Sequence, residues 1–175
     1  MELWDVYNRN REKTGKTMIR GAAFEEGAYH LVIHVCVFNA EGKMLIQQRQ
    51  PFKHGWPNLW DVTVGGSAVM GEDAQTAAMR EIKEELGLTV NFTGIRPRIT
   101  VNYDHGFDDF FVTFLEVEPD SLTLQYEEVQ SAKWATKQEI LQMISNGTFI
   151  PYYPALIELL FDSRDRYGAH LSERP

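Results

Sequence analysis

The hydrophobic pattern along the chain switches between an extended period and a helical one. Residues 29–38, YHLVIHVCVF, are almost all apolar, which is typical of a strand that is buried on both faces. A turn at 39–42 separates them from a second predicted strand at 43–49, so the two segments are expected to form a hairpin. The remaining strands are predicted at residues 3–7, 17–20, 60–64, 89–103, 109–117 and 130–134.

Three segments have the helical period. The first ends at Gly87, a residue type that commonly stops a helix. The second opens with a capping-box sequence at 136–139, and the third begins at Pro154. The order of hairpin, strands, helix, strands and two helices predicts an α/β fold, with a mixed β-sheet between helices in an α/β/α sandwich and a β-hairpin at the N-terminus.

Length and charge narrow the range of functions. The chain of 175 residues fits one domain, 1–175, with an N-terminal hairpin extension at 1–27 and a core at 28–167. Its net charge of −8 argues against duplex nucleic acid as a partner, and an anionic substrate would need local help from a metal and a few basic residues. Cys36 is the only cysteine, so a reducing, cytoplasmic setting is expected. No membrane role is expected, because no apolar run approaches the length that spans a bilayer.

Three carboxylates carry the candidate chemistry. Glu81, Glu84 and Glu85 are spaced i, i+3 and i+4, so a helix places them on one face. Like charges this close repel unless a cation lies among them, and Mg2+ prefers oxygen ligands that it shares with substrate phosphates. The spacing therefore predicts a helix that holds a metal against a polyphosphate. The alternative is a solvated acidic helix face.

Basic residues precede this helix in the sequence. Arg49 ends the strand at 43–49, and Lys53 and His54 follow in the loop PFKHGWPN. These three are the groups best placed to bind phosphates, which arginine can grip with two hydrogen bonds. For Lys53 and His54, ordinary surface charge is an equal alternative. In the strand at 29–38, His30, His34 and Cys36 share one face, but core packing is favoured over a metal site because no fourth ligand is evident.

Residues 66–88 resemble the Nudix box at every specified position. The match runs from Gly66 through Glu72 to the string REIKEELGL, which begins at Arg80. The resemblance is to the Nudix hydrolase superfamily and implies a Nudix-type α/β/α sandwich. It also implies that Mg2+, with Mn2+ as a second choice, is bound by the carbonyl of Gly66 and by Glu81, Glu84 and Glu85. Glu72 and Arg80 would orient these ligands.

The resemblance further implies a reaction. In Nudix hydrolases a metal polarises a diphosphate, water attacks phosphorus, and a carboxylate takes the proton. Catalytic roles would fall to Glu84 and Glu85, the latter being the most essential, and to Arg80. An acid before the strand at 130–134 often serves as base or further ligand, so Glu128 is the first candidate and Glu127 the second. A solvated loop acid is the alternative for Glu128. Nudix chains also carry arginine at the position of Arg49.

Three functions stay open at this stage. The first is a metal-dependent hydrolase of a nucleoside diphosphate linked to another moiety, or of a similar small-molecule diphosphate. The second follows from flanks, such as YHLVIHVCVFN, that resemble the isopentenyl-diphosphate isomerase branch, where His30 would be at a metal-ligand position. However, the isomerase cysteine falls at Gly65, which favours hydrolysis. The third is a non-catalytic Nudix-like ligand sensor, which would not need the carboxylates. The family habit also allows a homodimer. The N-terminal hairpin could pair with a second subunit, cover part of the substrate cleft, or merely cap a sheet.

Overall fold

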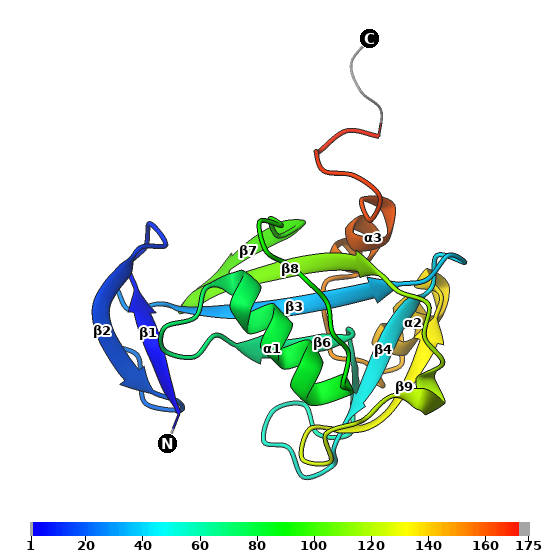
Figure 1. Cartoon of the computed structure of the whole chain (residues 1–175), viewed down its shortest axis with the longest axis horizontal. Helices are drawn as coiled ribbons and strands as arrows, with labels where there is room; N and C mark the ends of the chain where they lie inside the picture. The colour runs from blue at the N-terminus through cyan, green and yellow to red at the C-terminus, as the bar shows by residue number, and fades with distance from the viewer. Residues whose placement is uncertain (1, 172–175) are drawn as a thin grey trace.

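The computed structural model describes residues 2–171, whose strands and helices follow the predicted order (Figure 1). The elements are β1 (Leu3–Tyr7), β2 (Lys13–Ile19), β3 (His30–Phe38), β4 (Met44–Arg49), β5 (Trp60–Asp61), β6 (Val64–Ser67), α1 (Ala74–Leu86), β7 (Ile99–Tyr103), β8 (Gly106–Phe114), the 3-10 turn η1 (Pro119–Ser121), β9 (Val129–Ala135), α2 (Lys137–Ser145) and α3 (Pro154–Asp162). Residue 1 and residues 172–175 of the predicted single domain lie outside the described part, and the extent of the domain stays a prediction.

A mixed sheet of seven strands forms the middle layer, and β3 lies near its centre. β3 pairs in parallel with β8 and antiparallel with β6. β4 pairs antiparallel with β5 and β9, and β7 with β8. The predicted α/β fold with a mixed sheet is therefore confirmed.

Helices cover both faces of this sheet. The side chains of β3 alternate between two cores: Leu31, Ile33 and Val35 pack with α1, whereas Cys36 and Phe38 pack with residues of α2 and α3. Figure 1 shows α1 in front of the sheet and α2 and α3 behind it. The prediction that residues 29–38 form a strand buried on both faces is confirmed. None of the helices within residues 2–171 has the length and hydropathy needed to cross a membrane.

The predicted hairpin of β3 and β4 forms only at its turn. Phe38 pairs with Met44, and the two strands then diverge, so that β6 lies beside β3 while β5 and β9 lie beside β4. Thr63 connects the diverging strands, because its Oγ1 accepts from Val37 N at 2.9 Å and donates to the carbonyl of Leu45. The strand predicted at 60–64 is therefore split into β5 and β6.

Two strand predictions had wrong bounds: the one at 89–103 was too long, and the one at 109–117 lay three residues too late. Residues 89–98 form no ladder with the sheet, although their apolar residues alternate. Phe92 is buried as a strand residue would be, because its ring packs on Phe111 with the ring centroids 5.1 Å apart. The chain nevertheless turns at Gly94, whose φ is 74°, and forms no strand there. In the second case β8 begins at Gly106 and ends at Phe114, so the polar loop before it is reduced to residues 104–105.

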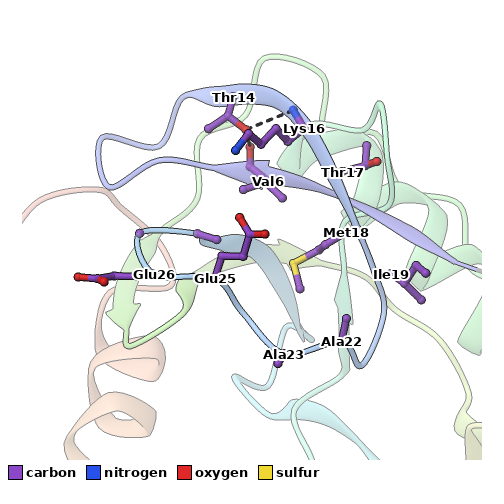
Figure 2. Close-up of a pocket in the computed structure, with 12 residues that line it drawn as sticks. Val6, Thr14, Lys16, Thr17, Met18, Ile19, Ala22, Ala23, Glu25 and Glu26 are labelled. Atoms are coloured by element: carbon purple, nitrogen blue, oxygen red, sulfur yellow. Dashed lines mark hydrogen bonds between the residues drawn. The ribbon is translucent and has the colours of Figure 1, made fainter.

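The N-terminal hairpin forms a separate two-stranded sheet, as predicted, although β2 begins four residues earlier than expected. It is held to the core by Trp4, which stacks on His30 at 4.3 Å, and by Arg11, whose Nη2 lies 2.6 Å from Oδ2 of buried Asp109. Figure 2 shows Met18 pointing into a pocket of about 450 Å³ between this hairpin and the loop at 22–28. β2 ends at Ile19, and Arg20, the next residue, lies at the edge of the site described next.

Candidate active site

Helix α1 positions the three predicted carboxylates. Its first turn is capped by Asp73, whose Oδ1 accepts from the backbone N–H of Thr76 at 2.8 Å, and it ends at Gly87 in the left-handed conformation. Burial of the alanine and isoleucine face against the sheet fixes the rotation of the helix. As a result, Glu81, Glu84 and Glu85 line one pocket together with Gly65 and Gly66 of β6.

Glu85 is the most deeply buried of the three acids, with 3% of its surface exposed. Its Oε2 accepts a hydrogen bond of 2.8 Å from the amide Nε2 of Gln47 on β4. Burial raises the pKa of Glu85 well above its ordinary value, and the charge of Glu81 raises it further. One amide donor is not enough to offset the burial of a carboxylate charge. A cation at this place would stabilise the ionised form.

Glu81 lies over the backbone of β6. Burial raises the pKa of Glu81 to about 7, even though Arg80 acts in the opposite direction. A Cβ atom on Gly66 would lie 2.2 Å from Oε1 of Glu81, far inside van der Waals contact. Glycine is therefore the residue that lets this carboxylate approach the strand.

These features fit a hard divalent cation. The available donors are carboxylate and carbonyl oxygens, which Mg2+ and Mn2+ prefer, and two of the carboxylates are buried with too little positive charge around them. Within residues 2–171 no three acidic, histidine or cysteine side chains already converge as ligands. Instead, Arg80 Nη1 bonds both Glu81, at 2.9 Å, and Glu84, at 3.0 Å.

Arg80 contacts protein groups on every side. Its Nε and Nη2 bind the two oxygens of Glu72 at 2.7 and 3.0 Å, and Nη2 also donates to the carbonyl of Ser67 at 3.1 Å. Glu72 in turn accepts from Val69 N at 3.0 Å. Arg80 was predicted both to orient the acids and to be catalytic. Its contacts tie α1 to the loop at 67–73, an arrangement that fits the predicted orienting role, and its catalytic role stays a prediction.

Cations and a further acid form the facing wall. Lys53 makes an ion pair with Glu128, and both line the same pocket as the α1 acids. Arg49 is also in this wall, with 16% of its side chain exposed. Two predicted residues are not brought to the pocket: His54 and the second-choice acid Glu127 are exposed and do not line it. The loop geometry thus separates Lys53 from His54, and Glu128 from Glu127.

The polar pocket has a volume of about 170 Å³ and includes residues that sequence reasoning missed. Arg20 and Glu2 come from the N-terminal hairpin, with Arg20 Nη1 3.1 Å from Oε2 of Glu2. Neither residue was predicted individually, although the hairpin as a whole was one candidate to cover part of the cleft. Gln47 does not line the pocket but donates to Glu85, and it could have been found because it lies two residues before Arg49 on the same strand.

A second pocket of about 350 Å³ adjoins the first. The two share five residues, so they form one continuous cleft: Arg20, Arg49, Gly65, Gly66 and Ser67. The second pocket is lined in addition by Val32 and His34 of β3, which point away from the face that α1 covers, and by Asp108 of β8. Trp56, Ile150 and Tyr152 complete its walls.

The residues His30, His34 and Cys36 share a face but lie in different surroundings. His30 stacks on Trp4, and His34 stacks on Phe110 with ring centroids 4.4 Å apart. Cys36 is fully buried, which raises the pKa of its thiol. These contacts show that all three side chains pack against other residues, as expected from the preference for core packing over a metal site.

Comparisons with known proteins agree on one family. A family model described as the NUDIX domain matches residues 28–154, which contain α1, β4 and β9. A curated relative, the uncharacterised Nudix hydrolase lmo0368 of Listeria monocytogenes, is 46% identical over 97% of this chain and 99% of its own length. An isopentenyl-diphosphate Delta-isomerase of Citrobacter koseri is 27% identical over 66% of this chain and 67% of its own. The solved structure of DR0079 from Deinococcus radiodurans has a TM-score of 0.73 at 24% identity, covering 90% of this chain and 98% of that one, and shows a similar fold.

Proposed function

The chain belongs to the Nudix hydrolase family, and we propose that it cleaves the diphosphate bond of a nucleoside diphosphate linked to another moiety, or of a similar small-molecule diphosphate, with Mg2+ or Mn2+ as cofactor. The observation that carries the proposal is the burial of Glu81 and Glu85 in a pocket whose facing wall holds Arg49 and Lys53. The carboxylates on one wall suit a divalent metal ion. The basic side chains on the other wall suit the substrate phosphates that would bind the same metal ion.

The residues divide the work between binding and orientation. The cation would be held by the carbonyl of Gly66 and the carboxylates of Glu81, Glu84 and Glu85. When bound, a divalent cation neutralises charge on the phosphate and promotes attack by water. Gln47 orients the carboxylate of Glu85 through its 2.8 Å hydrogen bond, and Arg80 with Glu72 fixes the helix relative to β6. Arg49 and Lys53 would hold the phosphate that does not react.

Glu128 is the proposed general base. Its carboxylate lines the pocket opposite α1 and is held by the ammonium group of Lys53, so it is available to take a proton from the attacking water. Glu127 provides a matched control, because it is the next residue in the chain but lies exposed outside the pocket. Glu128→Gln should lower the turnover number about a hundredfold, whereas Glu127→Gln should leave it unchanged. Equal rates for wild type and Glu128→Gln would return the role of base to Glu84 or Glu85.

The test of the function is hydrolysis of a panel of phosphoanhydrides with Mg2+, followed by chromatographic separation of the two phosphorylated products. The panel contains ADP-ribose, dinucleotides, nucleotide sugars, coenzyme A, oxidised nucleoside triphosphates and isopentenyl diphosphate. The proposal expects at least one substrate whose turnover requires the cation and is lost in Glu85→Gln. Silence across the whole panel, in the presence of Mg2+ or Mn2+, would support the sensor function instead.

The isomerase alternative receives no support from the site. Isomerisation requires a proton donor and acceptor at carbon, and the position of the isomerase cysteine is held by Gly65. A Cβ atom there would already lie 3.0 Å from Nδ1 of His34, so a larger side chain would require His34 to move.

We further propose a cytoplasmic setting, which agrees with a single buried cysteine. A homodimer stays a prediction.

A further inference from the structure

The guanidinium group of Arg49 is held from behind, while its outer edge is left open. Nε donates to the carbonyl of Gly55 at 3.0 Å, and Nη1 lies 3.8 Å from Oδ2 of Asp61. Neither Nη1 nor Nη2 donates a hydrogen bond to another group within residues 2–171. These two nitrogens form the edge that can bind a phosphate with two parallel hydrogen bonds.

Asp61 is a buried carboxylate beside Arg49, with 3% of its surface exposed. Its Oδ1 accepts two hydrogen bonds of 2.8 Å, from Tyr152 Oη and from Val62 N. Both donors bind the same oxygen, so Oδ2 is the one that faces Arg49. A buried carboxylate charge is costly unless a cation lies near it, and Arg49 is the ion-pair partner that Asp61 has among the described residues.

Tyr152 reaches Asp61 from the segment that precedes α3. Ile150 N donates to the carbonyl of Trp60 at 2.8 Å, which ties this segment to β5. The ring of Tyr152 meets His34 and Phe110 edge-on, with centroid distances of 6.1 and 6.4 Å. Burial and the nearby carboxylate raise the pKa of Tyr152 well above its ordinary value, so its hydroxyl group stays a donor.

We propose that Asp61 and Tyr152 are positioning residues for phosphate binding: Tyr152 fixes the carboxylate of Asp61, and Asp61 orients the guanidinium group of Arg49 toward the substrate. This inference rests on the proposed hydrolysis of a diphosphate. A separation of 3.8 Å is too long for a hydrogen bond, so Arg49 is attracted to Asp61 but keeps its donors for the phosphate.

The first test is the affinity for imidodiphosphate with Mg2+, measured by calorimetry. This probe has no organic group that could contact the ring of Tyr152 directly. Tyr152→Phe keeps the ring and removes the donor, and it should weaken binding about fivefold. Asp61→Asn keeps an acceptor for Tyr152 but removes the charge that attracts Arg49, and it should weaken binding about tenfold. Tyr153→Phe is the matched control, because Tyr153 is the next residue, is 82% exposed and does not line the cleft.

A double-mutant cycle with Arg49→Met separates positioning from a general structural effect. Once the guanidinium group is absent, Tyr152→Phe should change the affinity for imidodiphosphate by less than about twofold. With the best substrate of the panel, Tyr152→Phe should raise KM about fivefold and leave kcat within about twofold of wild type.

Several outcomes would overturn this inference while leaving the proposed hydrolysis intact. These are a Tyr152→Phe variant that binds as tightly as wild type, an equal loss of affinity with and without Arg49, and a wild type that binds no imidodiphosphate. Tighter binding by Asp61→Asn would also overturn it, because Asp61 would then merely oppose the charge of Arg49. Conversely, a loss of affinity that depends on Arg49, in a protein that hydrolyses no member of the panel, would support the positioning role and overturn the proposed function.

Discussion

The replacement of Gly66 by alanine tests how closely the metal pocket is built. The backbone of Gly66 is not in the left-handed region, so alanine is compatible with its conformation. The added methyl group would lie 2.2 Å from Oε1 of Glu81 and 2.3 Å from its Cδ. Because β6 is paired with β3, the strand cannot retreat easily, and the carboxylate of Glu81 must move instead.

The required movement is large for a metal site. To reach an ordinary van der Waals contact of 3.4 Å from the new methyl group, Oε1 has to withdraw by about 1.2 Å. A displacement of about 1 Å at a catalytic group can lower a rate roughly a hundredfold. We therefore expect Gly66→Ala to lose about two orders of magnitude in kcat, with a weaker dependence on Mg2+.

The assay is the rate of product formation from the best substrate of the panel, followed by chromatography at several Mg2+ concentrations, and it is combined with urea unfolding followed by circular dichroism. Gly55→Ala is the control, because a Cβ atom there meets nothing within 4 Å and its φ is also not left-handed. The control should match wild type in rate and stability. If Gly66→Ala hydrolyses the substrate as fast as wild type, with the same Mg2+ dependence, Glu81 does not hold the cation over β6.

Four other changes have expected results. Gln47→Leu removes the donor to Glu85 and should weaken Mn2+ binding about tenfold by calorimetry; unchanged affinity would exclude this orienting role. Mg2+ at about a hundred times its Kd should add about 2.7 kcal/mol to the free energy of unfolding in urea, and no such gain should be seen in Glu85→Gln. Arg11→Ala leaves the buried carboxylate of Asp109 with fewer partners and should cost about 2 kcal/mol; an unchanged urea midpoint would show that the N-terminal hairpin is not anchored there. Thr136→Ala removes the N-terminal cap of α2, so it should lower the free energy of unfolding by about 1 kcal/mol and leave kcat unchanged. A drop in kcat would contradict a purely structural role for Thr136.

The acidic half of the site could be predicted because it is local. Glu81, Glu84 and Glu85 belong to one helix, whose period alone brings them together, and Asp73 and Gly87 mark its ends in the sequence. Arg49 and Lys53 could also be predicted, since a strand end and the following residues stay near the strand. The choice between Lys53 and His54 could not, because it depends on how the loop folds back on Glu128.

The second pocket, which adjoins the metal pocket, could not be predicted because it depends on pairing between distant segments. Parallel pairing of β3 with β8 places Val32 opposite Asp108, and the residues between them in sequence include the whole of α1. Arg20 reaches the cleft only because the N-terminal hairpin docks through Trp4 and Arg11. Alternation also misled the prediction at residues 89–98, where Phe92 is buried from a loop rather than from a strand.

The central claim is that the buried carboxylates of α1 hold the divalent cation on which hydrolysis depends. The most direct measurement is the rate of hydrolysis as a function of Mg2+ concentration, for wild type and Glu85→Gln. The wild-type rate should be negligible in the presence of a chelator and should saturate with Mg2+, while Glu85→Gln should stay at least about a hundredfold slower at saturation. Turnover that persists without a divalent cation, or a Glu85→Gln variant as fast as wild type, would contradict the claim.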